Sequence, residues 1–180
     1  DISVADDPTV MDAIATSGCR QLLIGLESPC TDELRGLDPA AWKARQAPRY
    51  RRAIHELQSR GVSVNGCFIL GLDGQTPDAF AQVLDFVRTS GLAEVQYTVL
   101  TPFPGTPLYA RLQAEGRLLF ERDWDRCTLF DVGYRPDSMS VEELEKGLAW
   151  LFRETYGARE TRSRQRRFHA QRHAGPLSAA

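Results

Sequence analysis

The sequence predicts an α/β protein whose centre is a small sheet of about four parallel strands. Three times, a stretch with helical apolar spacing ends at a glycine and is followed by an apolar strand. Each of these strands then runs into a short segment of glycine and polar residues. Successive helix–strand units give parallel strands, and parallel sheets bind ligands at the carboxyl ends of their strands. We therefore expect the functional site in the three segments that follow the strands.

The first two strands are expected near the start of the chain. Residues 2–5 read as a strand, and a helix follows with Asp7 as its N-cap, Pro8 at its first position and Gly18 at its end. Residues 21–26 are apolar at nearly every position, which is typical of a strand buried on both faces.

Two further helix–strand units complete the expected sheet. A proline-containing segment, 29–48, is expected to hold a short helix and an exposed loop. A helix over 49–61 then leads to a strand over 62–70, and a helix over 76–91 leads to a strand over 94–100.

The chain is expected to have three parts. Residues 1–108 hold the sheet, and residues 109–157 form a C-terminal extension whose last helix begins with a capping box of Ser140 and Glu143. Residues 158–180 are a basic tail, expected to be a solvated helical extension or disordered. The tail could contact nucleic acid or an acidic partner, but a single aromatic residue lies among its charges, so nucleic acid is not expected as a partner.

Composition excludes several classes of function. The 180 residues carry a net charge of -2, with 42% hydrophobic and 26% charged residues, which excludes binding to polyanions through bulk charge. No apolar run approaches the roughly 18 residues of a membrane span, so no membrane partner is expected. Four widely spaced cysteines form no zinc or dithiol motif and favour a reducing, cytoplasmic compartment. A first residue of Asp1 rather than Met favours a piece of a longer protein.

The three strand ends supply the candidate ligand-binding residues. Glu27 emerges where its strand leaves the core, and its carboxylate can bind a ribose diol or an ammonium group, or pair with an arginine of the next loop. The glycine-rich run 66–74 allows close approach of a ligand, or is a tight turn with a positive φ at Gly74. The rigid loop 101–106 could flank a flat ring such as adenine, or serve stability alone. No histidine pairing or hydrolase motif points to hydrolysis or zinc chemistry.

Taken in order, these motifs resemble the later half of a radical S-adenosylmethionine (SAM) enzyme, in particular of the subgroup that often carries an N-terminal cobalamin-binding domain. The resemblance covers residues 1–156. It is carried by Ser3-Val4-Ala5-Asp6-Asp7-Pro8, Gly18-Cys19, Ile24-Gly25-Leu26-Glu27-Ser28, Gly66-x-Phe68-Ile69-x-Gly71-Leu72-Asp73 and Leu100-Thr101-Pro102-x-Pro104-Gly105-Thr106-Pro107-Leu108. In the extension, Gly116-Arg117-Leu118, Asp123-Trp124 and the helix ending at Tyr156 resemble the C-terminal extension of that subgroup.

The resemblance implies a partial (β/α)₆ barrel, of which this chain would supply strands three to six. It also implies a role for nine residues in binding SAM. Glu27 and Ser28 would contact the ribose or methionine part. The residues expected against adenosine and at the border of adenine are Gly66, Phe68, Gly71, Asp73, Leu100, Thr101 and Pro102.

One departure from the family pattern concerns the metal cluster. Family members bind a 4Fe–4S cluster through Cys-x₃-Cys-x₂-Cys, and this triad is absent from the sequence. The chain alone therefore cannot perform the reductive cleavage of SAM. Lys43 stands outside the usual pattern of its loop, and no role is assigned to it. The resemblance leaves open whether cobalamin is used, because its domain would lie upstream of Asp1.

The leading hypothesis is the C-terminal portion of a radical SAM enzyme that performs a radical-based transfer or rearrangement, methyl transfer included. The chain would contribute contacts to SAM and to a small-molecule substrate, while cluster-binding and cobalamin-binding regions would lie upstream. One alternative is a non-catalytic remnant or partner subunit that binds a nucleotide or a protein through the half-barrel. Another is an unrelated half-barrel enzyme whose glycine-rich loop binds a phosphorylated substrate.

Overall fold

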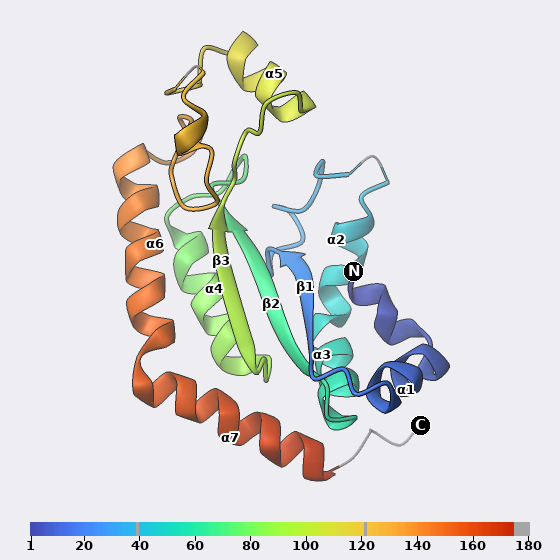
Figure 1. The fold of residues 1–180 in the computed structure, drawn as a ribbon. Coiled ribbons are helices and arrows are strands. Elements are labelled where there is room, and N and C mark those ends of the chain that lie inside the picture. The colour runs from blue at the N-terminus through green and yellow to red at the C-terminus, as the bar shows by residue number, and fades with distance from the viewer. Residues whose placement is uncertain (39, 121, 175–180) are drawn as a thin grey trace.

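A parallel sheet of three strands forms the centre of the molecule (Figure 1). The computed structural model describes residues 1–38, 40–120 and 122–174. The strands are β1 (Gln21–Glu27), β2 (Ser63–Leu70) and β3 (Glu94–Val99), in the order β1-β2-β3. Leu23 pairs with Asn65, and Asn65 pairs with Glu94. The prediction of an α/β fold with parallel strands is therefore confirmed.

The prediction of a fourth strand over residues 2–5 is wrong. The segment is a 3-10 helix, η1 (Ile2–Asp6). The Asp1 carboxylate caps this helix by accepting a hydrogen bond from the Ser3 amide at 3.0 Å. Ile2 is fully buried. A local cap and one buried apolar side chain therefore determine the conformation, where the short apolar pattern had suggested a strand.

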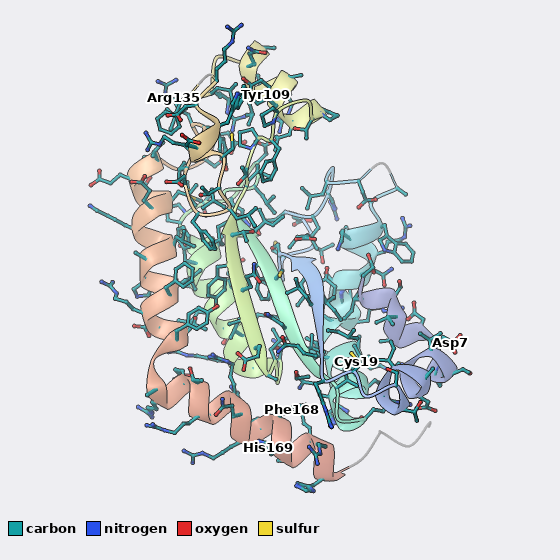
Figure 2. The ribbon with its side chains drawn as sticks, in the orientation of Figure 1. Asp7, Cys19, Tyr109, Arg135, Phe168 and His169 are labelled. Carbon is teal, nitrogen blue, oxygen red and sulfur yellow. The ribbon has the colours of Figure 1, made fainter. Side chains whose placement is uncertain are left out.

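The helices of the first part follow the sequence pattern closely. The Asp7 carboxylate accepts hydrogen bonds from the Thr9 amide at 2.8 Å and the Val10 amide at 3.4 Å, so it caps the first helix as predicted (Asp7 is labelled in Figure 2). Gly18 ends this helix with a φ of 86°. The helices of this part are α1 (Pro8–Thr16), α2 (Trp42–Gln46), η2 (Ala47–Arg49), α3 (Tyr50–Ser59) and α4 (Asp78–Thr89).

The sheet has one covered face and one open face. Helices pack against the covered face (Figure 1), and its side chains form the core: Ile24, Leu26, Val64, Phe68, Leu70, Val95, Tyr97 and Val99. Among the described residues, no helix covers the other face, where the Leu23 side chain is 61% exposed. The expectation that β1 is buried on both faces is therefore wrong for this chain. A run of apolar residues indicates a strand but does not show which layers are present to cover it.

The C-terminal extension begins beyond the carboxyl ends of the strands (Figure 1). Its elements are α5 (Pro107–Ala114), η3 (Trp124–Arg126) and α6 (Val141–Tyr156). The predicted capping box is present, because the Ser140 hydroxyl accepts from the Glu143 amide and the Glu143 carboxylate accepts from the Ser140 amide. The Tyr97 and Phe152 rings meet edge to face, with centroids 5.8 Å apart, where α6 lies against β3.

The basic tail forms a helix over most of its length. Helix α7 (Ala158–Ala174) passes below the amino ends of the strands in Figure 1. It is fastened to α3, because the Gln58 side chain of α3 donates a hydrogen bond to the Gln171 side chain of α7. Of the two alternatives expected for the tail, the helical extension and not disorder is present over 158–174, and the inner face of the helix has partners in the fold. Residues 175–180 lie outside the described residues.

Within the described ranges, no helix combines the length and the hydropathy that a membrane span requires.

Candidate functional site

The carboxyl ends of the three strands lie side by side. Glu27, at the end of β1, pairs with Phe68 of β2, and Leu70 pairs with Val99 of β3. The Leu100 amide continues the ladder beyond β3 by donating to the Leu70 carbonyl at 2.9 Å. The structure therefore brings the three predicted segments to one edge of the sheet, as parallel pairing requires.

Glu27 occupies an unusual backbone position at this edge. The register shifts between Gly25 and Glu27, and Glu27 has a φ of 65°, in the left-handed region that non-glycine residues rarely adopt. Its carboxylate folds back over Gly25, where a β-carbon would collide with it. The bulge and the glycine together aim the carboxylate along the edge of the sheet.

Lys43 of α2 pairs with Glu27. Its Nζ atom lies 3.2 Å from Glu27 Oε1 and donates to the Gly25 carbonyl at 2.7 Å. The same ammonium group lies 3.7 Å from the Asp1 carboxylate. About four fifths of each side chain in the Lys43–Glu27 pair is buried, with relative exposures of 20% and 19%. Glu27 is thus paired with a cation from the segment that follows β1, but the cation is Lys43 of the short helix α2 and not an arginine of a loop.

Ser28 faces into the protein, away from the open edge. Its side chain is fully buried, and its hydroxyl donates to Glu33 Oε2 at 2.5 Å. Gln75 donates to the same oxygen at 2.7 Å and accepts from the Gly71 amide at 2.8 Å. This network joins the ends of β1 and β2. It uses the Ser28 hydroxyl and the Gly71 amide internally.

The predicted residues of β2 also face the interior. Gly66 lies on the covered face, where a β-carbon would come within 3.0 Å of Leu26 and Leu92. Phe68 is fully buried, and its ring lies 5.9 Å from that of Phe86, between centroids. The Gly71 carbonyl accepts a hydrogen bond from the Tyr134 hydroxyl. These three residues pack the core beneath the edge.

Asp73 connects the sheet to the C-terminal extension. Its carboxylate oxygens lie 2.6 Å from Arg111 Nη2 and 3.2 Å from Arg117 Nη2. The neighbouring Gly74 amide donates to the Asp137 carboxylate at 2.9 Å. The loop after β2 is therefore held by charges from three places in the extension, whose other side chains include Tyr109 and Arg135 (Figure 2).

The predicted residues after β3 are packed between the end of the sheet and the C-terminal extension. The Thr101 hydroxyl is 2.9 Å from the carbonyl oxygens of both Val99 and Thr128. Pro102 is buried, and Leu100 is half-buried. Thr101 and Pro102 border a cavity of about 10 Å³ shared with Tyr109. A cavity of this size holds about one water molecule and is too small for adenine.

The open face of the sheet carries polar side chains that the sequence reasoning did not single out as a group. Asn65, Cys67 and Gln96 lie on it, each half-buried. The Asn65 Oδ1 atom is buried and has no hydrogen-bond partner among the described residues. Burial, and to a smaller extent the Glu27 carboxylate, raises the pKa of the Cys67 thiol, so the group stays protonated and is a weak nucleophile. Side chains of alternate residues in a strand lie on the same face, so the sequence of β2 could have predicted that Asn65 and Cys67 share one face.

The edge and the open face together can bind a ligand but hold no metal by themselves. They offer a carboxylate, an ammonium group, two amides and a thiol. In the part of the chain that the structure describes, no group of three His, Cys, Asp or Glu side chains could hold a metal ion. The arrangement suits a polar organic ligand with both positive and negative groups.

The second half of the chain matches a known family model. Residues 106–178 match the model described as a domain of unknown function (DUF4070). The match includes α5, α6 and α7.

The chain is also similar to several methyltransferases. It is 27% identical over 149 residues to the bacteriochlorophyllide d C-12(1)-methyltransferase of Chlorobaculum tepidum, covering 83% of this chain and 31% of that protein. It is 25% identical over 136 residues to the bacteriochlorophyllide d C-8(2)-methyltransferase of the same organism, covering 76% and 30%. It is 27% identical over 125 residues to the hopanoid C-2 methylase of Rhodopseudomonas palustris, covering 67% and 22%. The chain thus spans less than a third of the length of these relatives.

Proposed function

We propose that this chain is the C-terminal part of a methyltransferase of the radical SAM type, and that the edge holding Glu27 and Lys43 is one wall of its SAM site. The three methyltransferase relatives support the reaction class. The observation that carries the proposal is the largely buried Glu27–Lys43 pair at the carboxyl edge of a parallel sheet.

The chemistry of this pair fits SAM. SAM carries an ammonium group and ribose hydroxyls, which a carboxylate binds, and a carboxylate, which an ammonium group binds. Lys43 Nζ contacts both Glu27 and the Gly25 carbonyl, so it can exchange one contact for a ligand oxygen while keeping the other. Half-buried Leu100 is the candidate for the border of adenine. Ser28, Phe68 and Gly71 would support the site from beneath.

We infer that the edge and the open face of the sheet have different roles. SAM supplies the methyl group when it is bound. Glu27 and Lys43 would orient it, and the open face with Asn65, Cys67 and Gln96 would face the substrate. The described residues do not fit a 4Fe–4S cluster, because they contain no group of three suitable ligands. The proposal therefore places the cluster ligands in a preceding segment, and no step is assigned to them here.

Binding of SAM to the protein translated from the complete reading frame tests the proposal. Equilibrium dialysis with labelled SAM is expected to show about tenfold weaker binding for Glu27→Gln and for Lys43→Met, since a hydrogen bond to a charged group contributes about 1.5–3 kcal/mol. Glu142→Gln is the matched control, because this exposed glutamate pairs with Lys146 on α6, the helix that packs beside β3 and not beside β1. It should bind SAM as the wild type does.

Two results would contradict the proposal. One is unchanged SAM affinity in both edge variants, which would remove the edge from the SAM site. The other is a complete reading frame that encodes no Cys-x₃-Cys-x₂-Cys segment, which would remove the radical SAM assignment. In that case the binding measurement still decides whether the edge recognises SAM.

A further inference from the structure

An open groove lies between α3 and α4, two helices that pack on the covered side of the sheet (Figure 1). Its volume is about 660 Å³, within the range of about 300–1,000 Å³ that is usual for small-molecule sites. The segment after β1 and the short helix η2 complete its walls. Apolar side chains make up much of the lining: Pro29, Ala47, Pro48, Ala81 and Phe86. The groove therefore has room for a ligand and an apolar surface on which its body can lie.

Arg51 of α3 places a positive charge on one wall of this groove. Its guanidinium carbon lies 4.9 Å from the centre of the Phe86 ring, which is a cation–π distance. Phe86 is buried, and its ring meets the Phe68 ring edge to face at 5.9 Å, so the support beneath the guanidinium group is fixed. Among the described residues, Arg51 forms no ion pair and no side-chain hydrogen bond. Its N–H donors are therefore available to a ligand.

Asp85 of α4 places a negative charge on the same groove. Its side chain is exposed, and within the described ranges no ion pair joins it to Arg51 or to any other cation. Gln82 lies one turn earlier on the same helix and adds an amide donor and acceptor to the lining. Two opposite charges that share a groove without pairing can be bridged by a ligand that carries both charges.

We propose that this groove binds a small zwitterion with a flat apolar body, the chemical class to which the aromatic amino acids belong. The carboxylate of the ligand would bind Arg51, and its ammonium group would bind Asp85. Its ring would lie on the apolar lining beside Phe86. A simple anion or a simple cation fits less well, because each leaves one charge of the groove without a partner.

The groove is next to the edge proposed for SAM but is a different surface. Neither Glu27 nor Lys43 belongs to its lining. Cys30 does belong to it, and the Cys30 amide donates to the hydroxyl of Ser28, the residue after Glu27, at 2.9 Å. We therefore expect the groove to bind its ligand in the presence of SAM. The partly buried Cys30 thiol provides a chemical probe of occupancy.

Alkylation of Cys30 in the protein translated from the complete reading frame tests this site. The rate of reaction with iodoacetamide is measured by peptide mass spectrometry, with L-tryptophan as the ligand. At about ten times its Kd, tryptophan is expected to slow the alkylation of Cys30 about tenfold. The rate at Cys19, which precedes β1 and is labelled in Figure 2, should not change.

Two analogues of tryptophan test the two charges separately. Tryptamine lacks the carboxylate, and indole-3-propionate lacks the ammonium group. Each is expected to need about a fivefold higher concentration than tryptophan for equal protection of Cys30, since this is the upper range for one exposed ion pair.

Variants assign each charge to its residue. Arg51→Gln should remove the advantage of tryptophan over tryptamine, and Asp85→Asn should remove its advantage over indole-3-propionate. Arg52→Gln is the matched control, because Arg52 is exposed on the same helix and does not line the groove. It should leave protection by tryptophan unchanged.

Three outcomes would overturn the proposal. Protection of Cys30 by none of the three compounds would show that the groove does not bind this class of ligand. Equal protection by all three would show that the two charges do not contribute to recognition. Loss of protection on addition of SAM would place tryptophan in the SAM site. The three compounds are compared on the wild type, so the comparison decides the matter even where a variant fails to fold.

Discussion

Two glycines in the loop after β2 have the same backbone conformation but different surroundings. Gly71 and Gly74 have φ values of 85° and 80°. A β-carbon on Gly71 would collide with the Tyr134 hydroxyl and lie 2.8 Å from Leu144 Cδ2, whereas none of the surrounding atoms would lie within 4 Å of one on Gly74. Gly71 therefore permits both a left-handed backbone and the close approach of the C-terminal extension.

We expect Gly71→Ala to destabilise the protein more than Gly74→Ala. The left-handed backbone costs about 1–2 kcal/mol for alanine in either variant, and overpacking adds about 1–3 kcal/mol at Gly71 alone. Urea unfolding of both variants and the wild type measures the difference. Equal losses of unfolding free energy would show that Tyr134 and Leu144 move aside without cost.

At single residues, the sequence predicted positions better than contacts. It placed Glu27 at the end of a buried strand, and the structure agrees. It did not reveal that Ser28 turns inward to Glu33, or that Lys43, which lies in α2 16 positions further along the chain, reaches Glu27. Both contacts depend on how the chain returns to the sheet, and local patterns do not encode that path.

Between elements, a buried tyrosine joins the sheet to α6. The Tyr97 hydroxyl is 2.8 Å from Thr155 Oγ1, and both side chains are buried. Burial raises the pKa of Tyr97 to about 12, although the hydrogen bond with Thr155 lowers it in part. The neutral phenol is therefore favoured in the folded protein.

The stability of this contact is expected to depend on alkaline pH. The stabilisation is complete below the unfolded pKa of about 10 and is lost as pH rises towards 12, by up to about 1.4 kcal/mol per pH unit. Tyr97→Phe is expected to be about 1 kcal/mol less stable at neutral pH, with a smaller further loss between pH 9 and 11. Urea unfolding of the wild type and of Tyr97→Phe across this range measures how the unfolding free energy of each protein changes with pH. An equal change in the two proteins would contradict a role for Tyr97 in the pH dependence.

Helices with local signals were predicted from the sequence, whereas for α7 the sequence left open whether the segment is a helix or disordered. Asp7, Ser140 and the glycines at helix ends mark α1, α3, α4 and α6 in the sequence. Helix α7 has a polar inner face that includes Arg164 and Gln171, so its sequence shows no apolar stripe. Its docking depends on carbonyl and side-chain partners that only the folded chain provides.

For the molecule as a whole, the open face of the sheet has consequences for solubility. Leu23 is 61% exposed on β1, which is an edge strand of the sheet among the described residues. Exposed apolar edges promote pairing between chains, and a lysine on such an edge opposes it. The isolated chain is therefore expected to form oligomers or aggregates.

We expect Leu23→Lys to shift the isolated chain towards the monomer. Size-exclusion chromatography with light scattering, over a range of concentrations, measures the change in mass. Leu37→Lys is the control, because Leu37 is 42% exposed in the loop between β1 and α2 and belongs to no strand. A sharp monomeric peak for the wild type would show that the open face does not drive association.

At this scale, the order of helices and strands predicted the parallel sheet but neither its extent nor its coverage. The apolar run in β1 suggested two buried faces, and the structure buries Ile24 and Leu26 while leaving Leu23 exposed. Alternation of burial along β2 is regular. A sequence pattern reports which side chains favour burial, but the layer that covers them is a property of the assembled fold.

The left-handed backbone of Glu27 has an evolutionary consequence. Glycine would adopt a φ of 65° at lower cost, so the backbone conformation alone would favour glycine at this position. The chain instead has a side chain whose carboxylate lies over Gly25 and next to Lys43. The backbone and the side chain thus favour different residues at position 27, and selection for ligand recognition would account for a residue that the backbone conformation disfavours.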